Sequence, residues 1–291
     1  MIHLFKKHTH EDTPKEGMLL RVEHVSVAFD HPVLKDVSIS VGHGETLAIL
    51  GKSGTGKSVL LKLIVGLLDP DQGKIYYRDN DVTNLNEKKL MELRTSIGFL
   101  FQGSALFDSM TVGQNLDFFL VKHTELEQDE REKKIVEALE MVQLEKAIDK
   151  LPSELSGGMR KRAGLARSIV LEPELMLYDE PTTGLDPLTA SSIAELILEM
   201  QARLGIASIV VTHDLPTAFT VADRAVVMND GFTVFDGKLE ELHDSSDEFL
   251  REYVGASHLD RARRDKILKE RKSEPEESAP EKLEKKEAVA A

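Results

Sequence analysis

The stretch ETLAILGKSGTGKSVLLKLIVGLL, residues 45–68, places an apolar segment, a glycine-rich loop and an amphipathic segment directly after one another. The first segment is typical of a strand, and the apolar spacing of the last predicts a helix. The loop between them matches the pattern GxxxxGKS, with Lys57 and Ser58 at its end. The stretch therefore predicts an α/β element that binds phosphate groups.

The loop at residues 51–58 supplies the groups that a nucleoside triphosphate needs. Its glycines let the backbone wrap closely around phosphate oxygens, with the amides pointing inward. We expect Lys57 to reach the β- and γ-phosphates and Ser58 to hold Mg²⁺. The predicted ATP-binding residues of the loop are Gly51, Lys52, Ser53, Gly54, Thr55, Gly56, Lys57 and Ser58.

Two carboxylates follow a later apolar run, in the sequence LMLYDEP at residues 175–181. A buried strand here would deliver Asp179 and Glu180 to the carboxyl end of the sheet, where α/β proteins bind ligands. We expect Asp179 to meet Mg²⁺ through water and Glu180 to orient and deprotonate an attacking water. Taken alone, the pair could also be a turn with solvated carboxylates.

Two single polar residues end other predicted strands on the same side. Gln102 closes IGFLFQ and can both ligate the metal and sense the helical segment that follows. His213 closes SIVVTH and can hydrogen-bond the γ-phosphate, although a lone histidine is more often structural. The predicted catalytic residues are Glu180, His213 and Gln102. The predicted metal site consists of Ser58, Gln102 and Asp179.

A second candidate anion site lies far from the loop, at LSGGMRKRAGLAR, residues 155–167. Ser156, Gly157 and Gly158 open a predicted helix, and free amides at a helix start attract anions. One phosphate loop binds one ATP, so these residues are expected to hold the γ-phosphate bound by a second, head-to-tail copy. Hydrolysis would then release the pair. We interpret the basic run at residues 160–162 as solvated or facing the partner.

Composition excludes several other classes of function. The 291 residues contain 37 Lys and Arg against 51 Asp and Glu, a formal net charge of -14, which argues against nucleic acid as a partner. The absence of cysteine excludes disulfides, thiolate nucleophiles and cysteine metal sites, and it fits an intracellular setting. No apolar run approaches the length of a transmembrane helix.

The pattern predicts three regions along the chain. Residues 1–17 form a flexible leader, residues 18–255 form the ATPase domain with a helical insertion at about 107–165, and residues 256–291 form a charged, disordered tail. The segment SSDEFLREYVGAS could be a short helix with apolar residues on one side. It is either a fraying C-terminus or a tether to the other copy. Its apolar side contains Phe249, Leu250, Tyr253 and Val254.

These motifs, in this order, resemble the ATPase subunit of ABC transporters from Met18 to about Val254. The resemblance implies an α/β fold of the P-loop NTPase type, with a mainly parallel sheet, an N-terminal antiparallel β-subdomain and an inserted helical subdomain. It also implies that Phe29 stacks on adenine and that Asp186 lies at the dimer seam. The implied cofactors are ATP and Mg²⁺. The implied partners are a second copy and membrane-embedded permease subunits.

Within that superfamily, FQGSALFDSMTV and the basic run after Met159 are similar to the ATPases of the Mla type. These energise phospholipid transporters that work with MCE-domain proteins. The resemblance implies an MCE-domain partner and a small regulatory subunit, at the cytoplasmic face of the inner membrane. Another cargo, such as lipoprotein, metal or amino acid, remains an alternative. A non-transport ABC ATPase is disfavoured, because the chain has one cassette and no sustained heptads.

Overall fold

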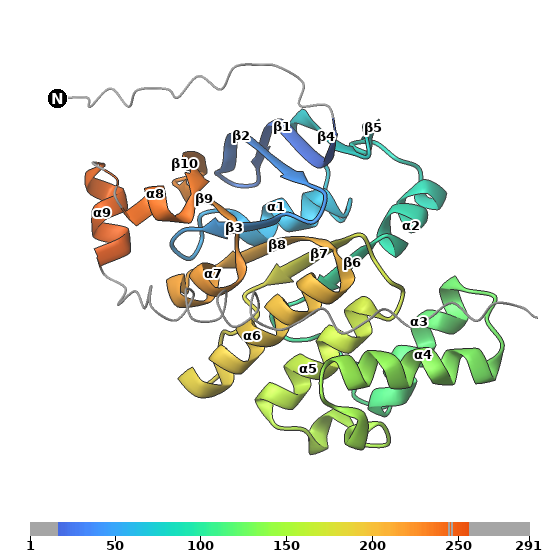
Figure 1. The fold of residues 1–291 in the computed structure, drawn as a ribbon. Helices are drawn as coiled ribbons and strands as arrows, with labels where there is room; N and C mark the ends of the chain where they lie inside the picture. Colours follow the sequence, from blue (N-terminus) through green and yellow to red (C-terminus); the bar gives the residue numbers. More distant parts are fainter. Residues whose placement is uncertain (1–16, 244, 246, 256–291) are drawn as a thin grey trace, which may run out of the picture.

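A computed structural model describes residues 17–243, 245 and 247–255 (Figure 1). The predicted leader, apart from Gly17, and the predicted tail lie outside these residues. No helix of the described part is long and apolar enough to cross a membrane.

The first part of the chain forms an antiparallel sheet with the strand order β2-β1-β4-β5. Apolar side chains alternate along its two long strands, so one face of the sheet is buried. The strands are β1 (Met18–Ala28), β2 (Pro32–Gly42), β4 (Gln72–Tyr77) and β5 (Asn80–Asp81).

A second sheet, with the order β10-β9-β3-β8-β7-β6, carries the site. All its strand pairs are parallel except that of β10 with β9. The continuous apolar runs of its central strands fit a sheet that is covered on both faces. The strands are β3 (Thr46–Leu50), β6 (Ile97–Leu100), β7 (Leu175–Asp179), β8 (Ala207–Thr212), β9 (Arg224–Asn229) and β10 (Phe232–Lys238).

The faces of this sheet belong to separate apolar clusters. Leu47 and Ile49 of β3 pack with α1 (Lys57–Ile64) and the antiparallel sheet, and α2 (Glu87–Thr95) adds one buried leucine. Ala48 and Leu50 pack with helices on the other side of the sheet. Figure 1 shows these helices, among them α5 (Gly157–Ile169) and α6 (Pro187–Leu204), on the side away from the antiparallel sheet. This confirms the predicted mainly parallel α/β core with an N-terminal antiparallel sheet.

The helices of the other layer include those of the predicted insertion. Their apolar sides form one cluster with the sheet, so this part is packed directly onto the core. The helices are α3 (Val112–His123), α4 (Gln128–Met141), η1 (Glu145–Ala147), η2 (Pro152–Glu154), α5 (Gly157–Ile169), α6 (Pro187–Leu204) and α7 (Leu215–Val221).

The described chain ends with α8 (Leu239–His243) and α9 (Glu248–Gly255). Leu250 and Val254 of α9 are buried in the same apolar cluster as α5 and α6. A fraying C-terminus therefore does not describe residues 248–255.

Candidate active site

The loop between β3 and α1 requires its glycines for two physical reasons. Gly51, Gly54 and Gly56 all have a φ in the left-handed region, at 152°, 85° and 95°. A Cβ on Gly51 would lie 2.4 Å from the carbonyl oxygen of Met228, and one on Gly56 would lie 2.5 Å from Leu34. The loop is thus wedged between β9 and β2. A Cβ on Gly54 would meet nothing within 4 Å, so that turn faces open space.

The helix that follows this loop begins without a capping side chain. Gly56 is the N-cap of α1, and no side chain accepts a hydrogen bond from the first amides of the helix. Free amides and the positive end of the helix dipole favour an anion here. The open space beside Gly54 leaves room for it. The loop therefore fits the triphosphate that its sequence predicts.

Lys57 lies folded back inside the loop. Its ammonium group donates hydrogen bonds to the carbonyl oxygens of Gly51, at 2.8 Å, and Lys52, at 3.0 Å. Burial lowers the pKa of Lys57, and the nearby carboxylates of Glu180 and Asp179 oppose that shift. The cation is held at the centre of the loop, where it can exchange carbonyl for phosphate oxygens.

We expect Lys57→Ala to weaken ATP binding by about 10- to 100-fold, because a charge-assisted hydrogen bond to phosphate is lost. Isothermal titration with ATP measures the effect. Lys62→Ala is the matched control, because Lys62 is an exposed lysine in the last turn of the same helix. Equal affinities of the Lys57→Ala variant and the wild type would contradict the assignment.

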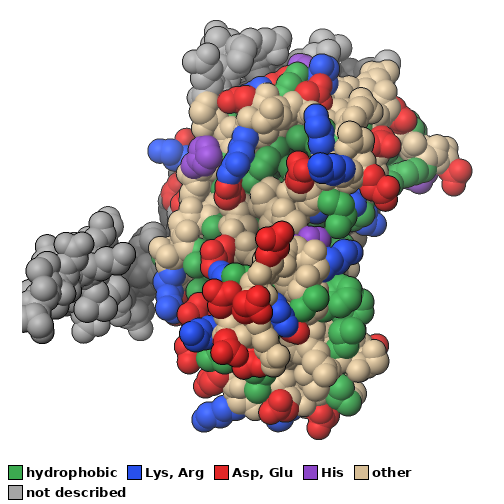
Figure 2. Space-filling view, turned by 90° about the vertical axis from the view of Figure 1, so that its right-hand side faces the viewer, with side chains coloured by type: hydrophobic (Ala, Val, Ile, Leu, Met, Phe, Trp, Pro, Cys, Tyr) green, Lys and Arg blue, Asp and Glu red, His purple; other side chains and the backbone are tan. Residues whose placement is uncertain are grey.

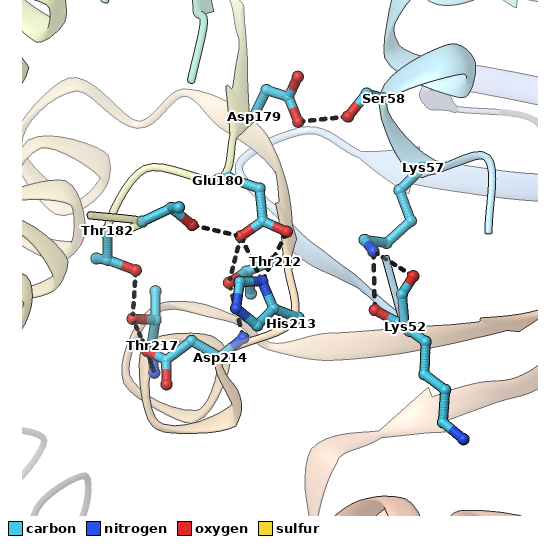
Figure 3. Close-up of polar contacts among 12 residues, drawn as sticks. Lys52, Lys57, Ser58, Asp179, Glu180, Thr182, Thr212, His213, Asp214 and Thr217 are labelled. Atoms are coloured by element: carbon cyan, nitrogen blue, oxygen red, sulfur yellow. Dashed lines mark hydrogen bonds and ion pairs between the residues drawn. The ribbon is translucent and has the colours of Figure 1, made fainter. Parts of the chain in front are cut away.

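Ser58 and Asp179 meet at the carboxyl ends of β3 and β7. The hydroxyl group of Ser58 donates to the Asp179 carboxylate at 2.7 Å (Figure 3). Burial raises the pKa of Asp179, and the hydrogen bond from Ser58 partly offsets the shift. A hydroxyl beside a buried carboxylate is a suitable pair of oxygen ligands for Mg²⁺.

These two groups would hold Mg²⁺ only together with a nucleotide. No group of three or more His, Cys, Asp and Glu side chains in the described residues could hold a metal. Mg²⁺ commonly takes one or two protein ligands and completes its octahedron with phosphate oxygens and water. The donor set therefore fits the predicted metal on a bound triphosphate.

Glu180 stands at the turn after β7, with its carboxylate held by several side chains (Figure 3). Nδ1 of His213 lies 2.9 and 3.0 Å from its two oxygens, and the hydroxyl group of Thr183 donates to it at 2.9 Å. Its side chain is 13% exposed, against 53% for His213. Its φ of 50° turns the backbone sharply away from the strand. The carboxylate is therefore oriented, partly desolvated and open on one side.

The sequence indicated Glu180 and His213 separately, and the structure brings them into contact. It also adds supports that the sequence did not single out. Thr183 donates to Glu180, while the hydroxyl group of Thr212 lies 3.5 Å from the carboxylate. Asp214 caps α7 by accepting from the amide of Thr217, which fixes the turn that carries His213. The only sequence signal for these supporting residues is that threonines and aspartates follow a strand, and such residues are equally typical of ordinary turns.

Gln102 follows β6 and is exposed. Its carbonyl oxygen accepts a hydrogen bond from Lys161 at 2.5 Å, and the same ammonium group lies 3.3 Å from the carbonyl oxygen of Glu180. The structure thus brings the backbone of Gln102 beside that of Glu180. The contact runs through the backbone, so metal ligation by the Gln102 side chain stays a prediction.

The turn predicted as a second anion site, residues 156–158, lies at the start of α5. Ser156 is its N-cap, and Ser156 and Gly157 are exposed. A Cβ on Gly157 would lie 3.3 Å from Leu185, and one on Gly158 would lie 2.6 Å from Thr189. The turn therefore packs against the start of α6. Among the described residues, no hydrogen bond joins this turn to the phosphate loop of the same chain.

Asp186 caps α6 next to this turn. Its carboxylate accepts from the amides of Leu188 and Thr189, both at 3.1 Å, and from the Thr189 hydroxyl at 2.5 Å. These hydrogen bonds, above all those from Thr189, lower the pKa of Asp186. Asp186 is exposed, as a residue at a dimer seam would be in a single chain.

Phe29 lies in the turn between β1 and β2, and it is 58% exposed. The neighbouring β2 residues Val33 and Leu34 are those that a Cβ on Gly56 would meet. The aromatic side chain is thus presented on the turn beside the phosphate loop. This position is compatible with the predicted stacking on adenine.

The interpretation of residues 160–162 as a solvated or partner-facing run was wrong for Lys161. Its side chain is directed inward and the residue is only 5% exposed. Arg162 also contacts its own chain, at the carbonyl oxygen of Val142 and the hydroxyl group of Ser192. Of the three residues, Arg160 is exposed.

Tyr253 is a contact of the phosphate loop that sequence reasoning missed. Its hydroxyl group accepts from the amide of Gly51 at 3.0 Å, and the ammonium group of Lys52 lies 5.7 Å from the ring centre of Phe249. Burial raises the pKa of Tyr253 to about 12. The apolar side of the segment was visible in the sequence, but the surface that it covers was not.

Comparison with known proteins agrees with this geometry. The family model described as ABC transporter matches residues 34–183. The probable ribonucleotide transport ATP-binding protein mkl of Mycobacterium leprae is 37% identical over 244 residues, which are 84% of this chain and 70% of that protein. The intermembrane phospholipid transport system ATP-binding protein MlaF of Escherichia coli is 37% identical over 222 residues, which are 76% of this chain and 82% of that protein.

A similar solved structure is that of the ATP-binding cassette MJ0796, a dimer in a post-hydrolysis state bound to ADP and Pi. It matches with a TM-score of 0.69 at 30% identity, covering 76% of this chain and 98% of that one. The family match includes the phosphate loop, β7 and Glu180, and the matches to the relatives cover most of this chain. The chain therefore belongs to the ABC transporter family and is an ATP-hydrolysing subunit of that family.

Proposed function

We propose that two copies of this chain close around two ATP molecules and thereby drive a phospholipid transporter in the membrane. One observation carries the proposal. The chain has two glycine-containing turns that open helices, at residues 51–58 and 156–158, and the second is exposed and packs on α6 rather than on the first. Each site would therefore combine the phosphate loop of one copy with the serine–glycine turn of the other. The dimeric state of the cassette MJ0796 supports this arrangement.

In this arrangement, different side chains of one copy have separate roles in ATP hydrolysis. Lys57 and the free amides of α1 bind the phosphates and stabilise the charge that develops on them. Glu180 orients a water molecule and takes its proton, while His213 holds the carboxylate and contacts the γ-phosphate. When bound between Ser58, Asp179 and Gln102, Mg²⁺ would neutralise charge on the β- and γ-phosphates.

An exposed apolar surface supports docking to membrane-embedded permease subunits. The rings of Phe107 and Phe118 lie edge to face at 5.1 Å, both are exposed, and Val121 is 57% exposed. They lie on and just before α3, shortly after Gln102 in the chain. Hydrophobic side chains also gather along one edge of the lower part of the molecule in Figure 2. Such clusters mark interaction surfaces.

The permeases would hold the chain peripherally at the cytoplasmic face of the inner membrane. An MCE-domain protein and a small regulatory subunit would complete the complex. The relative MlaF is described as part of an intermembrane phospholipid transport system, which favours phospholipid as the cargo. The relative mkl is described as a probable ribonucleotide transport ATP-binding protein, so ribonucleotide is the second candidate cargo.

Purification of the intact complex in detergent, followed by mass spectrometry of the bound small molecules, tests the cargo. We expect phospholipid at about one or more molecules per complex, enriched over the detergent extract of the same membranes. A preparation that carries the Glu180→Gln substitution serves as the non-cycling reference. Ribonucleotide other than ATP or ADP, or another cargo in place of lipid, would contradict the lipid assignment and leave the ATPase assignment intact.

A further inference from the structure

Lys161 is a buried cation that no predicted role accounts for. It lies on α5, one helical turn after the serine–glycine turn, and it is 5% exposed. Its ammonium group is 2.5 Å from the carbonyl oxygen of Gln102 and 3.3 Å from that of Glu180. One side chain therefore joins α5 to Gln102, the second residue after β6, and to Glu180, the proposed base after β7.

The surroundings commit Lys161 to these contacts. A buried ammonium group is costly unless its protons are hydrogen-bonded, and here backbone carbonyls accept them. Burial lowers the pKa of Lys161, while the carboxylates of Asp179 and Glu180 oppose the shift. The ammonium group is thus held by the backbone of Gln102 and Glu180, within the electrostatic influence of the Asp179 and Glu180 carboxylates.

A second cation on α5 secures the same loop farther along. Arg167 donates to the carbonyl oxygens of Ser104, at 2.9 Å, and Ala105. Both acceptor residues have a φ in the left-handed region, at 62° and 48°. The first part of the loop after β6 is therefore tied to α5 at two places, Gln102 and Ser104–Ala105. Of these two cations, only Lys161 also contacts the backbone of Glu180.

The two ends of this connection serve different ATP molecules in the proposed dimer. The turn at residues 156–158 contacts the ATP of the partner, whereas Glu180 acts on the ATP of its own chain. We propose that Lys161 is a positioning residue that couples the two ATP sites within each subunit. Binding of the partner's ATP at the start of α5 would fix the position of Lys161. Through its hydrogen bonds, Lys161 would then fix the positions of the turns that carry Gln102 and Glu180. This inference rests on the proposed shared sites.

The test uses the intact transporter complex and the ATP dependence of its hydrolysis rate. The wild type is expected to show a Hill coefficient clearly above 1. Lys161→Met keeps a side chain of similar length and removes the donors and the buried charge. We expect its Hill coefficient to fall to about 1 and its maximal rate to fall about tenfold or more, as for the loss of a charged hydrogen bond. The affinity for ADP should stay within about twofold of the wild type.

Two further variants separate positioning from general loss of structure. Lys161→Gln keeps two N–H donors on a shorter chain, and it should recover part of the Hill coefficient and of the rate. Arg162→Met removes the next cation of α5, which contacts Val142, Gln143 and Ser192 instead of the catalytic turns. This control should retain the wild-type Hill coefficient even if the substitution lowers the melting temperature.

Each outcome bears on the proposal. A wild-type Hill coefficient in Lys161→Met, equal losses in Arg162→Met, or a wild type without cooperativity would overturn it. If the complex with Lys161→Met does not assemble, the Hill coefficient of the Lys161→Gln complex is the test, and a wild-type value overturns the proposal. ATP-driven dimerisation of the Glu180→Gln chain tests the shared sites separately. If the Glu180→Gln chain forms an ATP-dependent dimer but the Lys161→Met complex keeps the wild-type Hill coefficient, the coupling role of Lys161 is rejected and the shared ATP sites are retained.

Discussion

Replacement of Glu180 by glutamine should lower the rate of ATP hydrolysis by about 10² to 10⁴, the range expected for a positioned general base. The amide has the size of the carboxylate, so the turn after β7 and its contacts with Thr183 and His213 can persist. Lys57 and the Ser58–Asp179 pair are untouched. Nucleotide binding should therefore survive, and the ATP-bound dimer should accumulate because its γ-phosphate is no longer removed.

Phosphate release in the steady state measures the rate, and light scattering after gel filtration with ATP measures the dimer. Glu174→Gln is a matched control, because Glu174 immediately precedes β7 and pairs with Arg78 at the opposite end of the strand. It should hydrolyse ATP at nearly the wild-type rate. Normal turnover by the Glu180→Gln chain would show that another group takes the proton.

Gly157→Asp should abolish ATP-driven dimerisation, with a loss of at least about a hundredfold in dimer affinity, because like charges brought together at an interface cost several kcal/mol. The fold should tolerate the change. A Cβ at this position would meet only Leu185, at 3.3 Å, and an aspartate in the first turn of α5 suits the helix dipole. The added carboxylate would face the partner's triphosphate.

Gly157→Asn separates charge from size, because asparagine has nearly the same shape without the charge. Its dimer should be weakened less than that of the aspartate variant. The affinity of the monomer for ATP, measured by titration at low protein concentration, should be unchanged in both. An aspartate variant that still dimerises with ATP would contradict the cross-subunit role of this turn.

The sequence alone predicts the parts of the site that depend on local rules. The observed helix α6 follows such rules, because Asp186 is its N-cap, Pro187 lies in its first turn and Gly205 ends it. The glycines of the phosphate loop are equally local, because each has a backbone conformation that side chains avoid. The positions of Glu180 and Gln102 follow from the common edge at which parallel strands end.

The parts that the sequence could not predict depend on contacts between distant segments. Lys161 stands in a basic run that is typical of a solvated surface, and its burial depends on the loop after β6. The contact of Tyr253 with Gly51 requires that α9 pack onto the core. No local pattern encodes either contact, because both are set by how α5 and α9 pack against the sheet.

Cross-linking between two differently labelled copies tests the shared sites most directly, and the chain has no cysteine that would interfere. One copy carries Ser53→Cys in the phosphate loop and the other carries Gly157→Cys, both with Glu180→Gln. With ATP and a short thiol-reactive cross-linker, the mixture should give a covalent dimer that contains one copy of each, and ADP should give none. Failure of ATP to promote that mixed product, in a sample that dimerises, would contradict the account.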